Sequence, residues 1–214
     1  MIIKNSILKG LGLIALIILT LGFTTPEEDI ERGKNLYVSC IPCHGDKAQG
    51  LQSMNSPALV NQDSWYLERQ LQNFKNGLRG TNPNDTYGAQ MAPMANTLTD
   101  AQAVKDVVAY IKTLPAVDTK KTIEGNIEKG QDYYNMICGG CHGPEAKGNE
   151  ILNSPKLKGI DDWYLERQFH GFKLGYRGTH PDDKFGFQMK LMTKVLPTDE
   201  DIKDVVAYIQ SLQN

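Results

Sequence analysis

The chain has 214 residues, of which 40% are hydrophobic and 22% charged, and a formal net charge of −2. This length suits one large domain or two small ones, and the composition excludes a disordered chain or a multi-span membrane protein. Four Cys are too few for the dense disulfide framework of small secreted domains. The near-neutral charge, with no cluster of Lys and Arg, excludes nucleic acid as an expected partner.

The first segment, residues 1–24, is predicted to be an export signal. Lys4 and Lys9 precede thirteen mostly apolar residues from Leu11 to Phe23, and this order is typical of a secretory signal peptide. A helix of that length reaches about 20 Å, short of the ~30 Å hydrocarbon core, so a membrane anchor through residues 1–23 is the weaker alternative. Either way we expect a periplasmic protein. Without residues 1–24 the chain has 21 basic and 25 acidic residues, a net charge of −4.

The rest of the chain is an internal duplication. The pattern Cys-x-x-Cys-His-Gly occurs at 40–45 and again at 138–143, an offset of 98 residues. The string Trp-Tyr-Leu-Glu-Arg-Gln recurs at 65–70 and 163–168 in the same register. Upstream of the Cys pairs the offset is 97, so one residue was inserted before Cys138.

The duplication predicts two small domains of similar size. We expect a first domain at 27–115, a linker at 116–125 and a second domain at 126–214. Domains of under ~95 residues have marginal cores and usually contain a staple, a metal or a cofactor.

Each copy is predicted to be helical. The first helix is expected at about 28–39 and a second at about 64–76. The second helix should begin after the capping residue Asp63 and end before Gly77. In the last helix, apolar residues at i, i+3, i+4 and i+7 follow a Thr99-x-x-Gln102 capping signal: Val104, Val107, Val108 and Ile111. No run alternates with a period of two, so the predicted fold class is all-α.

The Cys motifs indicate the cofactor. Cys-x-x-Cys-His is the attachment signature of c-type haem, in which both thiols bind the porphyrin and the His binds the iron. The alternatives are a thioredoxin-like redox pair, which needs a βαβ context, and a zinc site, which needs further ligands in each copy. The two remaining His, His170 and His180, align with Gln72 and Asn82, so no second His repeats. We therefore expect two covalently bound haems and no free thiol.

The second axial ligand is expected to be Met, which closes the iron to small ligands and raises its potential. Two pairs recur in register, Met91 with Met189 and Met94 with Met192. A repeated Met can also be a core filler. We favour the first pair because it should lie in loop ahead of the last helix, while the second pair stays an alternative. The predicted haem-binding residues are Cys40, Cys43, His44, Met91, Cys138, Cys141, His142 and Met189, and the iron ligands among them are His44, Met91, His142 and Met189.

These motifs resemble the class I cytochromes c, and their tandem arrangement is similar to the dihaem cytochromes of the c-four type. The modules also resemble cytochrome c domains attached to terminal oxidases. The resemblance covers about 27–214 and implies two tandem class I cytochrome c domains, each a small helical bundle around its haem. It implies that the carbonyls of Pro57 and Pro155 accept from the haem-binding His, and that Gly33 and Gly130 let the first and last helices cross closely. Arg79 and Arg177 are candidates for contact with haem propionates, or alternatively for surface ion pairs.

The resulting expectation is an electron carrier and not an enzyme, with no catalytic residue. The resemblance implies a quinol-oxidising complex as donor and a terminal oxidase as acceptor. The alternatives are a haem enzyme, such as a peroxidase or a small-molecule oxidoreductase, and a tethered cytochrome subunit of an oxidase complex. An enzyme would normally keep one iron open, and neither copy lacks its Met.

Overall fold

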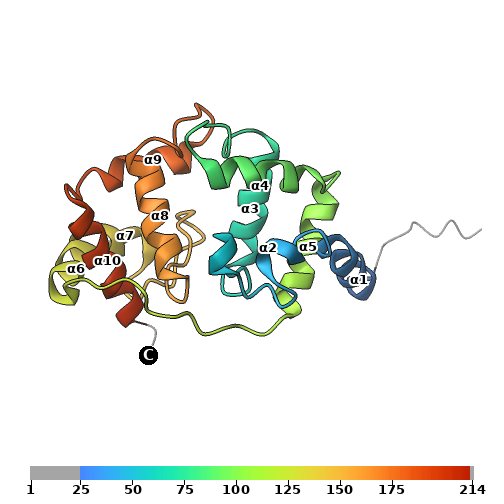
Figure 1. The fold of residues 1–214 in the computed structure, drawn as a ribbon, viewed down its shortest axis with the longest axis horizontal. Helices are drawn as coiled ribbons and strands as arrows, with labels where there is room; N and C mark the ends of the chain where they lie inside the picture. The colour runs from blue at the N-terminus through green and yellow to red at the C-terminus, as the bar shows by residue number, and fades with distance from the viewer. Residues whose placement is uncertain (1–24, 213–214) are drawn as a thin grey trace, which may run out of the picture.

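The computed structural model describes residues 25–212, which fold into two groups of helices lying side by side (Figure 1). The first module contains α1 (Pro26–Tyr37), α2 (Ile41–His44), α3 (Ser64–Lys75), α4 (Thr86–Asn96) and α5 (Ala101–Thr113). The second contains α6 (Ile127–Tyr133), α7 (Gly139–His142), α8 (Asp162–Lys173), α9 (Lys184–Thr193) and α10 (Asp199–Ser211). Within 25–212 there are isolated bridges but no strand, so the all-α class is confirmed.

The link between the modules runs in extended form along one edge of the molecule, from the end of α5 to the start of α6 (Figure 1). None of the helices described in 25–212 is long and apolar enough to cross a membrane. The predicted signal or anchor at 1–24 lies outside the described residues.

Two of the predicted helices have nearly the expected bounds, and one capping residue differs. α3 begins after Asp63, as expected, and ends at Lys75, one residue before the expected end. α5 begins one residue later than expected, because Asp100 and not Thr99 is its N-cap. The Asp100 carboxylate accepts from the backbone N–H of Ala103 at 2.8 Å, a contact that a short acidic side chain makes readily.

In each module the first and last helices cross at a glycine. A Cβ on Gly33 would lie 1.9 Å from the carbonyl oxygen of Asp106 and 3.0 Å from the Cβ of Tyr110. A Cβ on Gly130 would lie 1.9 Å from the carbonyl oxygen of Asp204. Since no side chain fits at such a separation, the close crossing expected of both glycines is confirmed.

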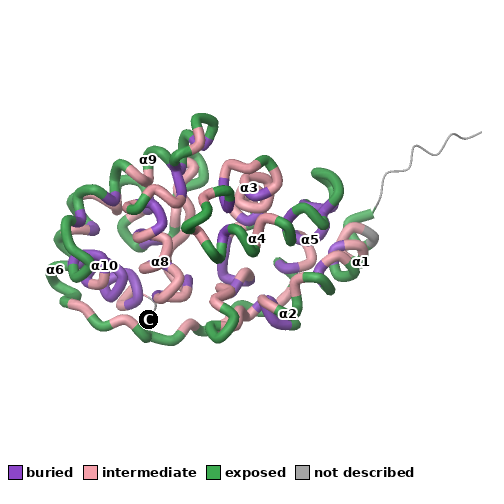
Figure 2. The backbone as a smooth tube through the Cα atoms, turned by 45° about the horizontal axis from the view of Figure 1, so that its top comes forward, coloured by how far each residue is buried: buried purple, intermediate pink, exposed green. Residues whose placement is uncertain are grey.

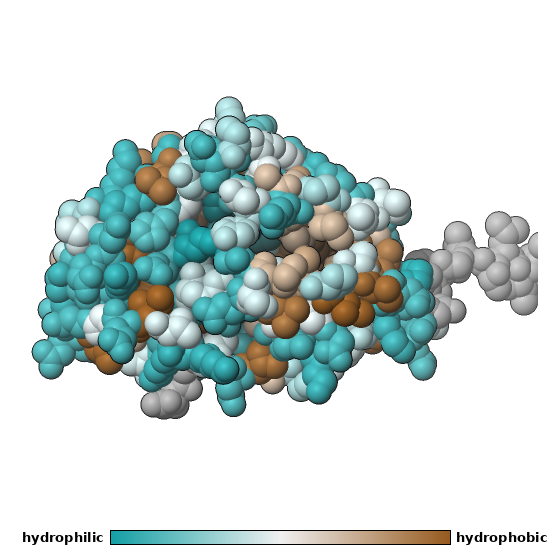
Figure 3. All heavy atoms as spheres, viewed as in Figure 1, coloured by the Kyte–Doolittle hydropathy of each residue, from teal (hydrophilic) through white to brown (hydrophobic). Residues whose placement is uncertain are grey.

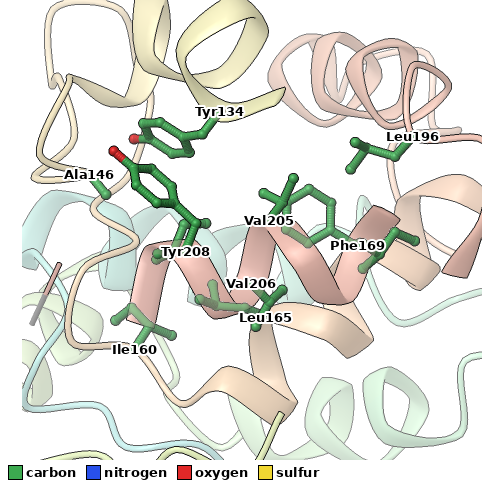
Figure 4. Packing of buried hydrophobic residues seen from close by; sticks show 11 residues of the cluster. Tyr134, Ala146, Ile160, Leu165, Phe169, Leu196, Val205, Val206 and Tyr208 are labelled. Carbon is green, nitrogen blue, oxygen red and sulfur yellow. The ribbon is translucent and has the colours of Figure 1, made fainter. Parts of the chain in front are cut away.

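The core of each module forms around these crossings. Buried positions gather along α5 and α10 (Figure 2). In the second module the ring of Tyr134 lies against that of Tyr208, with centroids 5.3 Å apart (Figure 4). The matching rings of Tyr37 and Tyr110 are 5.5 Å apart. The aromatic residues at these crossings therefore serve as core.

The residue inserted before Cys138 is accommodated in a π-helical turn, Tyr134–Cys138, between α6 and α7. The first module has no such turn, and α1 ends at Tyr37. A π-turn takes up one extra residue without breaking the helix. The insertion therefore leaves the Cys pair in the same relation to its module.

Candidate functional site

Each module surrounds a cavity that its own Cys-x-x-Cys-His residues line. The first module's cavity has a volume of ≈ 1410 Å³ with its solvent-open mouth, and that of the second module ≈ 1270 Å³. Figure 3 shows a hollow on the outer face between the modules. All eight predicted haem-binding residues line these cavities: Cys40, Cys43, His44 and Met91 the first, Cys138, Cys141, His142 and Met189 the second.

The two motif histidines are held in one orientation by a backbone carbonyl. His44 Nδ1 lies 2.9 Å from the carbonyl oxygen of Pro57, and His142 Nδ1 lies 2.7 Å from that of Pro155. Burial lowers the pKa of both imidazoles, which favours the neutral form. Because a carbonyl oxygen can only accept, Nδ1–H is the donor. Nε2 is then left with its lone pair free, the form in which imidazole binds a metal. The carbonyl contacts implied by the family resemblance are confirmed.

A tyrosine fixes the turn that follows each motif. The Tyr37 hydroxyl donates to the carbonyl of Gly45 at 2.8 Å, and the Tyr134 hydroxyl donates to that of Gly143 at 2.7 Å. The same aromatic residues that form the helix crossings therefore also hold the Cys-x-x-Cys-His segments in place.

The thiols do not have the electrostatics of a redox pair. Burial raises the pKa of Cys40 and raises that of Cys138 to about 11, whereas reactive redox cysteines have lowered values. No group of three His, Cys, Asp or Glu within the described residues is placed to hold a metal ion. Both alternatives to haem attachment therefore lack structural support.

The methionines lie on helices, so the expectation that they sit in loop was wrong. Met91 is in α4 and Met189 in α9. Asp85 and Asp183 are the N-caps of these helices. Their carboxylates accept from the backbone N–H groups of Gly88 and Gly186, at 3.0 and 2.9 Å. The two Asp-x-x-Gly strings were the sequence signal for these N-termini.

Both methionine pairs line the cavities, but they differ in exposure. Met94 is 36% exposed and Met192 46%, whereas Met91 and Met189 are half-buried. A buried Met is better placed to exclude water from a metal, so this difference favours the first pair.

The two cavities share a wall one layer of side chains thick. Six residues line both cavities: Gln62, Tyr66, Gln70, Ile160, Tyr164 and Gln168. The wall is formed by α3 and α8 and the residues just before them, at the centre of the molecule (Figure 1).

A ring of four side chains closes this wall. Gln70 Oε1 accepts from Arg79 at 2.8 Å and from Arg177 at 2.9 Å. Gln168 Oε1 accepts from the same two arginines. Arg79 and Arg177 are only 8% and 7% exposed and form no ion pair within the described residues, so the surface ion-pair alternative was wrong. Sequence reasoning missed Gln70 and Gln168, although the repeated Arg-Gln dipeptide marked them.

Comparison with known proteins agrees with the duplication. A sequence model of the family described as "Cytochrome c" matches residues 30–115 and again residues 127–213. The chain belongs to the cytochrome c family. Two such domains bring two covalently bound c-type haems, and the cavities provide the thiols, imidazoles and thioethers that such haems require.

Individual relatives match most or part of the chain. Cytochrome c4 of Stutzerimonas stutzeri is 30% identical over 92% of this cytochrome and 96% of its own length. The FixP subunit of a cbb3-type cytochrome c oxidase from Sinorhizobium medicae is 29% identical over 60% of this chain and 44% of its own length. The crystal structure of reduced recombinant cytochrome c4 from Pseudomonas stutzeri superposes with a TM-score of 0.66 and 26% identity, covering 85% of this chain and 97% of that one. This chain is therefore a dihaem electron-transfer cytochrome.

Proposed function

We propose that this cytochrome carries electrons in a periplasmic respiratory chain, from a quinol-oxidising complex to a terminal oxidase. The observation that carries the proposal is the wall of shared side chains, because it joins two complete haem cavities over a single layer. The similarity to an oxidase subunit supports a terminal oxidase as acceptor.

We assign the thioether bonds to Cys40, Cys43, Cys138 and Cys141, and the axial positions to His44, Met91, His142 and Met189. The haem supplies an iron that alternates between Fe(III) and Fe(II), one electron at a time. The protein would hold the imidazoles through the Pro57 and Pro155 carbonyls and would present one thioether to each iron from α4 and α9.

An electron-carrying role needs no bond making, and both cavities have the same donor set. An enzyme of the peroxidase or small-molecule oxidoreductase kind would need one iron open to substrate. The matched methionines favour the carrier over this alternative.

The test is a redox titration of the purified dihaem protein followed by electron transfer assays. We expect two haems per chain, low-spin spectra with a Met–Fe(III) charge-transfer band for both, and oxygen uptake by a cbb3-type oxidase when the reduced protein is added. A high-spin haem that binds peroxide or cyanide rapidly would contradict the carrier role. Reduced protein that cannot donate to any terminal oxidase would contradict the respiratory route alone.

Export and anchoring have a separate test. Mass spectrometry of the mature protein is expected to show loss of about the first 22–24 residues. A mature chain that retains them in the membrane fraction would favour the tethered alternative.

A further inference from the structure

Each haem cavity includes an arginine from the opposite module. Arg69 belongs to α3 of the first module, yet it lines the second module's cavity and not its own. Arg167, its copy in α8, lines the first module's cavity and not its own. The two side chains therefore cross the interface in opposite directions.

Aromatic rings and a backbone carbonyl hold Arg167 in this position. Its guanidinium carbon lies 4.5 Å from the ring centroid of Tyr87 and 5.0 Å from that of Trp163. Its Nη2 donates to the carbonyl oxygen of Asn55, in the first module, at 2.9 Å. The ring contacts favour a cation, so the site selects a charged arginine.

Two donor atoms of Arg167 are buried without a partner. Nε and Nη1 make no hydrogen bond, and no carboxylate of the described residues forms an ion pair with Arg167. Burial lowers the pKa of this guanidinium. Arg167 as a whole is half-buried, but leaving its two buried N–H groups without an acceptor is costly unless an anion accepts from them. Arg79, which lines the same cavity, has a third unpartnered donor, its Nε.

The matching arginine is better satisfied by protein groups. Arg69 donates from Nη1 to the side-chain oxygen of Asn153 at 3.2 Å and from Nη2 to its carbonyl at 3.0 Å. The unpartnered buried side-chain donors found in residues 25–212 are Arg79 Nε and the Nε and Nη1 of Arg167. Both residues line the first module's cavity.

We propose that Arg167 of the second module binds a propionate carboxylate of the haem in the first module. This inference rests on the haem positions proposed above. Haem carries two carboxylates, and a guanidinium recognises a carboxylate through charge-assisted hydrogen bonds. Arg167 thereby couples the docking of the two modules to the electron affinity of the first haem, because its positive charge favours the reduced iron.

The test compares Arg167→Gln with the matched variant Arg69→Gln in the full dihaem protein. Gln keeps a donor for the Asn55 carbonyl but loses the charge. Potentials are measured for each haem separately, with NMR haem-methyl resonances assigned to their modules. Arg167→Gln is expected to lower the electron affinity of the first haem about tenfold, equivalent to about 59 mV for a one-electron couple, and to change the second haem less. Arg69→Gln is expected to act on the second haem, and more weakly.

A second variant, Arg167→Lys, separates charge from packing. It retains the cation, so the first haem's potential is expected to stay near the wild-type value. Small-angle scattering shows whether the two modules remain docked. If Arg167→Gln separates the modules, the test uses the first-haem potential of the docked Arg167→Lys protein instead. An unchanged first-haem potential in docked Arg167→Gln would overturn the proposal, and so would a decrease in Arg167→Lys as large as the one expected for Arg167→Gln.

The underlying haem positions are checked on the same samples. Proteolysis and mass spectrometry of haem peptides are expected to find haem on the peptide containing Cys40 and Cys43. Haem absent from that peptide would overturn the proposed site itself, whereas haem present there with an unchanged potential would overturn only the role of Arg167.

Discussion

The two modules keep the contacts that hold the motif and differ in the helix that carries the methionines. In both, a proline carbonyl accepts from the motif histidine and a tyrosine hydroxyl donates to the following glycine. On α4 of the first module Ala89 and Pro93 occupy positions where α9 exposes Phe187 and Leu191. The difference shows that duplication preserved the groups that orient a ligand, whereas the outer surface was free to change.

Replacing the proposed methionine ligands is expected to have the largest effect. Met91→Ala and Met189→Ala should each remove one haem's Met–Fe(III) band and lower that haem's potential, because the iron loses its axial thioether. Spectroelectrochemistry measures both changes, and the two variants should behave alike.

The control for the ligand assignment is Met94→Ala. Met94 lines the same cavity but is more exposed, so its loss should leave both bands intact. Disappearance of the first haem's band in Met94→Ala would transfer the ligand role to Met94 and Met192.

Breaking the ring between the modules should have the next largest effect. Gln70→Leu leaves Arg79 Nη1 and Arg177 Nη2 without an acceptor. Gln168→Leu leaves Arg177 Nη1 without one, while Arg79 Nη2 keeps the Tyr164 hydroxyl. Buried unpaired donors cost about 1–3 kcal/mol each, so we expect Gln70→Leu to lose roughly 2–6 kcal/mol of stability at the interface and Gln168→Leu roughly 1–3 kcal/mol. Calorimetry should show the modules unfolding in two separate transitions.

The matched control for the ring is Gln52→Leu, because Gln52 lies on an exposed 3-10 turn. It should leave the unfolding profile unchanged. Equal profiles for Gln70→Leu and Gln52→Leu would show that the ring does not join the modules.

The modules should also differ in their response to acid. Asp201 accepts from Lys129 at 2.8 Å and caps α10 with Thr198, and these hydrogen bonds hold the pKa of its carboxyl well below the usual range. The first module has Ala103 at this position. Because the folded pKa is depressed, the stabilisation is complete above the unfolded value near ~4 and is lost as the pH falls below it.

We therefore expect Asp201→Asn to cost the second module about 1–2 kcal/mol at pH 7 and to flatten the loss of stability below about pH 4. Thermal unfolding between pH 7 and pH 3 measures both effects. High salt should reduce the difference, since Lys129 is 47% exposed. If the second module loses the same stability between pH 7 and pH 3 in the wild-type protein and in Asp201→Asn, this explanation is wrong.

The smallest expected effect comes from the tyrosine hydroxyls that recur in the two modules. Tyr37→Phe and Tyr134→Phe each remove one hydrogen bond, worth about 1 kcal/mol, while the ring packing stays. Thermal melts should show a similar small decrease for both variants. A much larger decrease in one module would show that the two copies hold their motif turns differently.

The local elements could be predicted because their causes are local. The apolar stripe of α5, the bounds of α3 and the Cys-x-x-Cys-His motifs follow from neighbouring residues in the chain, and the family resemblance supplied the proline and glycine contacts. The methionine helices were missed because Asp85 and Asp183 were not recognised as N-caps.

The sequence by itself determined that there are two copies of one haem-binding helical module. Only the tertiary structure decided how they meet, because Arg79 and Arg177 become buried, and Arg69 and Arg167 change cavities, through contacts between residues about 84–112 positions apart. Periodicity and motif spacing describe what lies within one helix or turn. The partner of a long charged side chain depends on how whole modules pack, and no local pattern encodes it.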